Sequence, residues 1–275
     1  MGQTLSHIRQ MLADYGLRPK KRLGQNFLHD AHHMARIVDA AAIEPGERVL
    51  EVGAGTGALS QRLLDAGAAL IAVEIDSDLE PILRDVFEPW GDRAKLIVGD
   101  VLASKGRLAG AVAGALGDGR FKLVANLPYN IASPLLVNLA LDWPGMTRAV
   151  VMVQREVAAR LAAGPGGADY GALGILVQAA CEVKPLATLS PRCFWPAPEV
   201  ESAVIQLDRR VEPLCPDMRA LAEVVHTLFQ KRRKQIGGIL GHDRITAAGL
   251  DPKSRPQELS IQDLTHLARD DPADG

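Results

Sequence analysis

Hydrophobic residues along this 275-residue chain recur at two spacings, and the two alternate over most of its length. Short apolar runs and strict alternation are typical of strands, whereas apolar residues three to four positions apart are typical of helices. From residue 33 onward, these spacings predict a regular succession of strands and helices. Helices are expected at 33–43, 58–67, 79–87, 134–142 and 155–163, and strands within 45–52 and at 68–76, 94–100, 121–125, 148–154 and 201–210.

Strands that alternate with helices are joined by right-handed crossovers into a mostly parallel sheet, so the pattern predicts an α/β fold. Residues 172–190 fit a helix or a strand and stay undivided, and the Ala/Gly-rich residues 103–119 predict no particular element. From residue 216 the spacing is helical, and one face collects the apolar side chains of Met218, Leu221, Val225, Leu228 and Phe229.

The chain exceeds the usual size of a single domain, about 100 to 200 residues. We place a boundary near residue 208, where the strand pattern gives way to the helical one. The prediction is a large domain at 1–208, with a basic N-terminal extension, and a small helical domain at 209–275.

Hydrophobic residues make up 47% of the chain and charged residues 23%, and no apolar run approaches the roughly 18 residues of a membrane span. The first fifteen residues lack the apolar core of a signal peptide, so we expect a cytoplasmic protein without a membrane partner. The opening MGQTLS fits the loose myristoylation pattern at Gly2, which we attribute to chance. The first seventeen residues and the tail RDDPADG match nothing specific and are expected to be mobile.

Cysteine and histidine spacing gives no sign of a metal site. The three cysteines form no CxxC pair and are interpreted as reduced, structural thiols: Cys181, Cys193 and Cys215. His29, His32 and His33 cluster, but no other ligand stands at metal spacing, so we expect them on a helix surface. The sequence therefore predicts no metal.

The net charge is −2, which by itself argues against nucleic acid as a partner. The distribution of charge argues the other way. Residues 1–36 and residues 219–244 each hold six Lys or Arg against two Asp or Glu, so each window carries +4 and the remainder carries −10. Two basic islands on an acidic body indicate local contact with a polyanion.

The stretch EVGAGTGALS places Gly53, Gly55 and Gly57 between a strand and a helix. There the absence of side chains lets a ligand lie against the backbone and the helix N-terminus. Gly53, Gly55 and Ala58 also satisfy the dinucleotide fingerprint, and Glu74 at the end of the next strand could hold a ribose in either case. A nicotinamide-dependent dehydrogenase is therefore an alternative at this point.

Two features favour a nucleoside over a dinucleotide. The third glycine follows the second by only two residues, and Asp100 closes the third strand. Glu74 is then placed for ribose hydroxyls and Asp100 for an adenine amino group. Because strand ends of a doubly wound sheet meet at one crevice, Gly53, Glu74, Asp100 and Asn126 are expected to line a single site.

The fourth strand ends in NLPYN, residues 126–130. Pro128 holds Leu127 in extended geometry and thereby fixes where the Leu127 carbonyl points. The amide oxygen of Asn126 and this carbonyl can therefore both accept from one exocyclic amino group while Tyr129 stacks on its ring. Two acceptors favour a pyramidal nitrogen with a free lone pair, which can attack an electrophilic methyl without a strong base or a metal.

Seven motifs in this order resemble the bacterial 16S ribosomal RNA adenine dimethyltransferases, the kasugamycin-sensitivity methyltransferases, which are related to the erythromycin-resistance 23S enzymes. The resemblance covers roughly residues 18–240, and its motifs are KKRLGQNFLHD, EVGAGTG, VEID, VGDVL, NLPYNIASPLL, QREVAARL and FWPAPEVESAV. It implies a Rossmann-like class I methyltransferase with a small C-terminal helical domain. The implied reaction is transfer of methyl groups from S-adenosylmethionine to N6 of two adjacent adenosines near the 3′ end of 16S rRNA, two on each.

The resemblance also implies roles for single residues. Asn26 and Leu28 would close over the cofactor, Gly53 would meet its methionine end, Glu74 its ribose, and Asp100 its adenine. Gly55 would also bind the cofactor, and Asn126 would belong to both the cofactor and the target base. The target adenosine, flipped out of its RNA, would be held by Asn126, Leu127 and Pro128 and stacked between Tyr129 and Phe194.

The basic islands are interpreted as phosphate contacts, the second of them at a helix C-terminus; they comprise Lys20, Lys21 and Arg22, and Lys231, Arg232, Arg233 and Lys234. The expected partner is 16S rRNA within an immature small ribosomal subunit, bound by a monomer with a role in ribosome biogenesis. Two alternatives stay open: a 23S rRNA adenine methyltransferase of the resistance type, and an assembly factor that mainly binds the particle.

Overall fold

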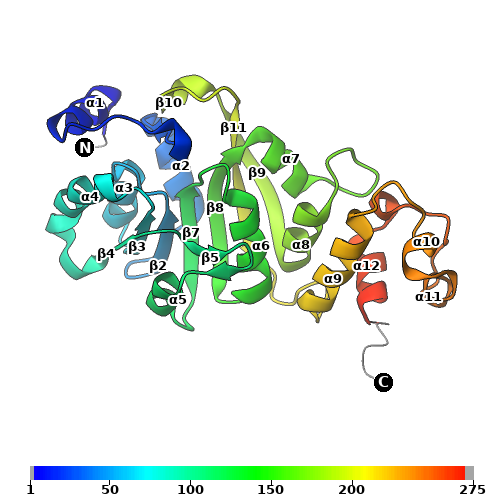
Figure 1. The fold of residues 1–275 in the computed structure, drawn as a ribbon. Coiled ribbons are helices and arrows are strands. Elements are labelled where there is room, and N and C mark those ends of the chain that lie inside the picture. The colour runs from blue at the N-terminus through cyan, green and yellow to red at the C-terminus, as the bar shows by residue number, and fades with distance from the viewer. Residues whose placement is uncertain (1–2, 270–275) are drawn as a thin grey trace.

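The structure is a computed structural model that describes residues 3–269. The segments predicted as strands lie side by side in one seven-stranded sheet (Figure 1). Across the sheet the order is β4 (Ala94–Val98), β3 (Ala69–Glu74), β2 (Arg48–Val52), β7 (Phe121–Asn126), β8 (Met146–Gln154), β11 (Ser202–Arg209) and β9 (Cys181–Leu189). Neighbours are parallel from β4 to β8, and β11 is antiparallel to both of its neighbours. The predicted, mostly parallel sheet is confirmed.

Helices cover both faces of the sheet because their apolar stripes and the all-apolar strands must be buried together. One face packs against α1 (Leu5–Asp14), α2 (Ala31–Ala41), α3 (Ala58–Asp65) and α4 (Glu80–Phe87). The other packs against α5 (Gly110–Leu116), α6 (Ala132–Asp142), α7 (Arg155–Ala162) and α8 (Ala172–Ala180). Two short ribbons, β1 (Phe27–Leu28) with β10 (Phe194–Trp195) and β5 (Leu102–Ser104) with β6 (Arg107–Leu108), complete the strands of the described chain.

The C-terminal helices lie at the end of the molecule next to α8 (Figure 1), and a third hydrophobic cluster joins them to α8. It contains the C-terminal helices α9 (Met218–Phe229), α10 (Gly237–Leu240), α11 (His242–Ala247) and α12 (Ile261–Arg269). The predicted face of α9 is its core: Leu221, Val225 and Leu228 are buried. Ile175 of α8 joins the same cluster, and the domain boundary near residue 208 stays a prediction.

Three segments differ in detail from the sequence expectation. Residues 172–190 divide directly into α8 and β9, because Cys181 turns extended where pairing with β11 begins. Residues 103–119 hold the end of a hairpin and α5. The helical pattern expected from residue 216 onward is interrupted at Gln230, the C-cap of α9, and residues 231–234 follow it directly, at the helix C-terminus as predicted.

The expectation of a mobile N-terminus is also wrong for the residues that the structure describes. Helix α1 is capped by Thr4, whose side chain accepts from the His7 N–H, and it buries Ile8 and Leu12 against the sheet-facing cluster. Gly2 and residues 270–275, which include nearly all of the acidic tail, lie outside the described residues. None of the helices formed by residues 3–269 has the length and apolar character that a membrane crossing requires.

Candidate functional site

A pocket opens at the carboxyl ends of β2 and β7, where the strand order reverses. Such a switch point leaves a crevice because the connections on its two sides run to opposite faces of the sheet. Gly53, Glu74, Asp100 and Asn126 all line it, as the sequence predicted for four strand ends in register. The predicted Asn26, Leu28 and Gly55 line it too, together with Leu127, Pro128 and Tyr129.

The glycine loop lies between the NLPYN segment and the N-terminal segment. Gly53 and Gly55 have φ of 79° and 61°, in the left-handed region that favours glycine. A Cβ on Gly53 would lie 3.2 Å from Cδ of Pro128, and one on Gly55 would lie 3.1 Å from Cδ1 of Phe27. Missing side chains thus let two segments far apart in sequence close on the loop from opposite sides.

Glu74 holds this loop in place. One carboxylate oxygen accepts from the Gly55 N–H at 2.8 Å, and the other accepts from the Asp76 N–H at 2.9 Å. Burial raises the pKa of Glu74 although these hydrogen bonds oppose the shift. Asp100, by contrast, is exposed, and its Oδ1 accepts from the Leu102 N–H at 2.9 Å. At the pocket, the carboxylate of Glu74 is therefore buried and that of Asp100 is exposed to solvent.

Glu51 is a pocket residue that sequence reasoning missed. It lies in β2 with only 1% of its surface exposed, and its carboxylate accepts a 2.5 Å hydrogen bond from the Ser60 hydroxyl. Burial raises the pKa of Glu51 to about 8. The available signal was an acid inside an otherwise apolar strand, a position that costs free energy unless the site uses it.

In the NLPYN segment, two oxygens are free to accept hydrogen bonds. Nδ2 of Asn126 donates to the Asn26 carbonyl at 3.1 Å, which commits the amide nitrogen and leaves the amide oxygen to accept. The Leu127 N–H donates to the Met152 carbonyl at 3.0 Å, and within residues 3–269 nothing donates to the Leu127 carbonyl. The Tyr129 ring is half-buried, and its hydroxyl lies 3.4 Å from that of Ser202. Two oxygens and one ring thus stand together at the pocket.

Phe194 does not line this pocket. In β10 it pairs with Leu28, and only 4% of its surface is exposed because it packs into the cluster beneath α1 and α2. Its neighbour Trp195 stacks with Phe27 at 6.5 Å between ring centroids, under the Arg9 guanidinium. A stacking role for Phe194 against a flipped base stays a prediction, and this conformation does not present its ring.

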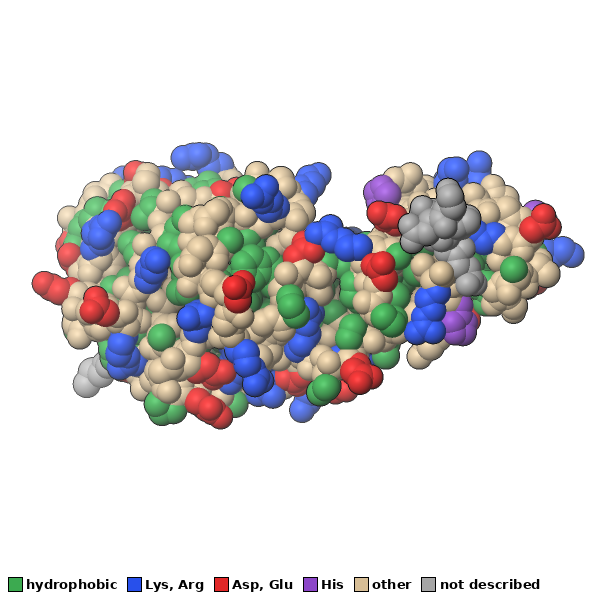
Figure 2. Space-filling view, turned by 90° about the horizontal axis from the view of Figure 1, so that it is seen from below, with side chains coloured by type: hydrophobic (Ala, Val, Ile, Leu, Met, Phe, Trp, Pro, Cys, Tyr) green, Lys and Arg blue, Asp and Glu red, His purple; other side chains and the backbone are tan. Residues whose placement is uncertain are grey.

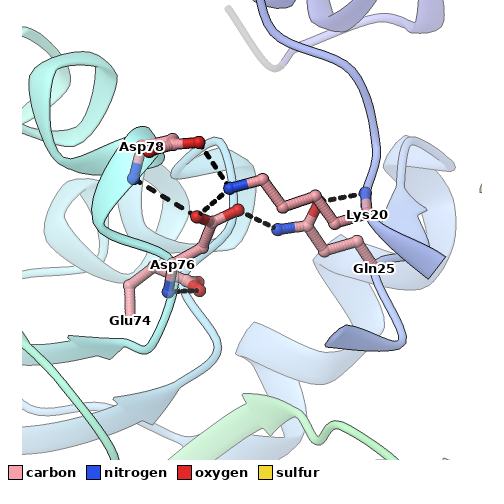
Figure 3. Close-up of polar contacts among 5 residues, drawn as sticks. All are labelled: Lys20, Gln25, Glu74, Asp76 and Asp78. Atoms are coloured by element: carbon pink, nitrogen blue, oxygen red, sulfur yellow. Dashed lines mark hydrogen bonds and ion pairs between the residues drawn. The ribbon is translucent and has the colours of Figure 1, made fainter. Parts of the chain in front are cut away.

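Polar and charged contacts hold the N-terminal segment against the residues that follow β3 (Figure 3). The Lys20 ammonium contacts carboxylate oxygens of Asp76 and Asp78, each at 2.5 Å, and the Gln25 amide donates to Asp76 at 2.7 Å. Burial alone would raise the pKa of Asp76, but the hydrogen bonds from Lys20 and Gln25 outweigh it and lower that pKa. Lys20, predicted as a phosphate contact, is used in this ion pair.

Gln3, which is 2% exposed, makes a second contact between the N-terminal segment and the rest of the domain. Its amide donates to the Thr56 carbonyl at 2.8 Å and accepts from the Thr56 hydroxyl at 2.8 Å. Helix α1 is thereby tied directly to the glycine loop. Local sequence patterns do not predict this contact, because it joins residues 53 positions apart.

The predicted RNA-contact residues divide into two groups. Arg232 donates to the carbonyls of Gly167 and Ala168, at 3.4 and 2.8 Å, and to Gln257 at 3.2 Å, so its guanidinium is used inside the fold. Five others are exposed: Lys21, Arg22, Lys231, Arg233 and Lys234. On the face seen in Figure 2, basic and acidic side chains are interspersed and form no continuous basic surface.

Comparison with known proteins identifies relatives that match over most of the chain. The family model described as ribosomal RNA adenine dimethylase matches residues 16–269. The protein named ribosomal RNA small subunit methyltransferase A from Rhodospirillum rubrum is 38% identical, over 98% of this chain and 93% of its own. The protein of the same name from Pseudomonas putida is 42% identical, over 94% and 97%.

Solved structures agree on the fold. A dimethyladenosine transferase from Plasmodium falciparum has a TM-score of 0.72 at 24% identity, over 88% of this chain and 95% of its own. The 23S rRNA methyltransferase ErmE has a TM-score of 0.66 at 26% identity, over 89% and 98%.

Proposed function

The chain belongs to the ribosomal RNA adenine dimethylase family, and from that premise we propose that it transfers methyl groups from S-adenosylmethionine to N6 of two adjacent adenosines near the 3′ end of 16S rRNA, two on each. The observation that carries the proposal is the hydrogen bond from Nδ2 of Asn126 to the Asn26 carbonyl. It fixes the amide so that the oxygen is the group left to face a substrate amine.

The pocket suits S-adenosylmethionine. Gly53 and Gly55 leave backbone exposed at the end of β2, where added Cβ atoms would meet Pro128 and Phe27. Glu74 and Asp100 are assigned to the ribose and the adenine, and Asn26 and Leu28 to the cover. S-adenosylmethionine supplies the electrophilic methyl group of the reaction.

The residues of NLPYN prepare the nucleophile. The adenine amino nitrogen is weak because its lone pair is delocalised into the ring. Acceptance of its two hydrogens by the Asn126 oxygen and the Leu127 carbonyl favours the pyramidal form, whose lone pair is free to attack. Pro128 holds Leu127 in extended geometry, which fixes the direction of the Leu127 carbonyl, and Tyr129 fixes the plane of the base by stacking. The proton leaves to water once the nitrogen is cationic, so the transfer itself uses no metal.

Several finer features form part of the same proposal. The substrate is an immature small ribosomal subunit in the cytoplasm, without a membrane partner, and the enzyme acts as a monomer. The helices from residue 209 onward form an RNA-binding domain. The N-terminal basic residues Lys21 and Arg22 contact the phosphates of the same RNA.

The test is methyl transfer from labelled S-adenosylmethionine to small and large ribosomal subunits of cells that lack this activity. Nuclease digestion and mass spectrometry then identify the product. We expect N6,N6-dimethyladenosine in the small subunit alone. Label only in 23S rRNA would instead assign the resistance-type reaction of ErmE, and tight binding without label would assign a binding-only assembly role.

Removal of the Glu74 side chain is expected to weaken S-adenosylmethionine binding by about 10-fold or more. Glu74→Ala leaves the buried N–H groups of Gly55 and Asp76 without acceptors, and one such loss costs roughly 1–3 kcal/mol. Calorimetric titration measures the affinity. Glu80→Ala is the control, because Glu80 pairs with Arg84 on the surface of α4. Equal affinities in both variants would contradict the role of Glu74.

Alanine substitutions of the neighbouring Arg232 and Arg233, after α9, are expected to change different properties. Arg233→Ala should lower affinity for the small subunit and reduce the salt dependence of binding by about one counterion, with the melting temperature unchanged. Arg232→Ala should lower the melting temperature, because carbonyls of Gly167 and Ala168 lose their donor. Binding at several salt concentrations and thermal melts measure both. The same loss of affinity and stability in both variants would remove the distinction.

A further inference from the structure

A carboxylate, an imidazole and a thiol meet outside the cofactor pocket, at the start of α2. They belong to Asp30, His33 and Cys193, and one ligand atom from each lies within 4.8 Å of the others. Cys193 is far from the other two in sequence, so neither the histidine cluster nor the cysteine spacing could indicate the group. The pairing of β1 with β10 brings them together.

The backbone around all three is fixed. Asp30 caps α2 and accepts from the His33 N–H at 2.9 Å, which holds these two residues in one turn. Cys193 ends a short turn at Pro191–Cys193, and its carbonyl accepts from the His29 N–H at 3.0 Å. The three side chains therefore start from positions that are set before any ligand arrives, which lowers the entropy cost of binding.

One atom of the group is left without a partner. Nδ1 of His33 is buried, and no hydrogen-bonding atom of residues 3–269 satisfies it. Buried polar atoms in folded proteins nearly always have a hydrogen-bonding partner, so we expect a ligand to bind this nitrogen.

We infer that Asp30, His33 and Cys193 bind one Zn²⁺ ion, with water as the fourth ligand. Zn²⁺ takes thiolate, imidazole and carboxylate ligands in a tetrahedron, and its bond lengths separate neighbouring ligand atoms by roughly 3.5 Å. Closing the observed spacing needs side-chain shifts of about 1 Å. A thiol and an imidazole select Zn²⁺ over Mg²⁺ or Ca²⁺, which take oxygen ligands.

Binding exchanges one bond for another at Cys193. The S–H bond breaks, its proton goes to solvent, and the thiolate sulfur bonds to the ion, with no change of oxidation state. The ion joins the first turn of α2 to the residue that precedes β10. Because β1 carries Leu28 at the wall of the cofactor pocket, the ion braces the ribbon that supports this wall.

The test is calorimetric titration of ZnCl₂ into the reduced full-length chain, with Co²⁺ as a spectroscopic probe. We expect one Zn²⁺ per chain, a thiolate-to-cobalt charge-transfer absorption, and a higher melting temperature with Zn²⁺. Cys193→Ser and His33→Ala should each weaken binding by roughly 100-fold or more, since even outer-shell partners cost 10- to 100-fold. Asp30→Asn should weaken it as well while keeping the helix cap, because Asn caps as well as Asp.

The matched control is His32→Ala, which removes the exposed neighbouring histidine. This variant should bind Zn²⁺ as the natural chain does. The inference is overturned if the natural chain binds no Zn²⁺, if Cys193→Ser binds it equally well, or if Co²⁺ gives no thiolate band. Loss of binding in His32→Ala with retention in His33→Ala would place the ion on surface histidines and also overturn it. Far-ultraviolet circular dichroism of each variant establishes that the fold is kept.

Discussion

Asn126→Ala is expected to lower the rate of methyl transfer by roughly 10²-fold or more while binding of the small subunit is largely kept. The loss is comparable to removing one preorganised hydrogen-bonding group from an active site. The alanine variant lacks the oxygen that accepts from the target amine and the nitrogen that ties the segment to the Asn26 carbonyl. Single-turnover transfer from labelled S-adenosylmethionine measures the chemical step, and a filter-binding assay measures the particle.

Asn126→Asp separates the two parts of this role. Aspartate keeps the acceptor oxygens but cannot donate to the Asn26 carbonyl. If acceptance by residue 126 is the main contribution, Asn126→Asp should retain more activity than Asn126→Ala. Normal transfer by Asn126→Ala would show that the proposed cradle is wrong. Equal losses in the two variants would instead assign the effect to the contact with Asn26.

Glu51→Gln is expected to change how the free energy of unfolding depends on pH. The pKa of Glu51 is about 8 in the folded chain, against 4.5 as its ordinary value. Between these values the folded state holds a proton that the unfolded state has lost, so stability from this group is full below pH 4.5 and is lost as pH rises toward 8. Glutamine cannot ionise. The variant should therefore gain stability relative to the natural chain by about 1 kcal/mol per pH unit across this window.

Urea unfolding at a series of pH values measures this difference. Ser60 remains able to donate to the glutamine oxygen, so the comparison isolates the charge on Glu51. Glu223→Gln, at an exposed position of α9, controls for the loss of one acid. Parallel stability profiles for the natural chain and Glu51→Gln between pH 4.5 and 8 would mean that Glu51 is ionised in the folded protein.

Part of the fold and site could be predicted from local sequence. Apolar periodicity located six of the seven strands of the sheet and five of the eight helices that cover it within residues 3–269, because burial on one or both faces leaves a repeat in the chain itself. The ends of four strands were recognisable from Gly53, Glu74, Asp100 and Asn126, and the pocket at those strand ends follows from the rule for parallel sheets. Periodicity did not locate the junction of α8 and β9, because the start of β9 is set by its pairing with β11.

Glu51 and Phe194 show the limit within the site. In the sequence, Glu51 is one acid within an apolar strand, and its depth of burial is known only from the structure. The raised pKa of Glu51 is a consequence of that burial. Phe194 lies in a motif that indicates base stacking, yet its ring packs beneath α1 and α2. Desolvation and packing depend on neighbours from distant segments, which a one-dimensional pattern does not contain.

The sequence by itself determined the alternating α/β architecture, the glycine loop and the acceptors of NLPYN, because each depends on residues close together in the chain. Tertiary structure alone decided which residues meet across the chain. It tied Gln3 to Thr56, engaged Lys20 with Asp76, and brought Cys193 to Asp30 and His33. The physical reason is that contacts between distant residues follow from strand order and packing, which spacing along the chain does not specify.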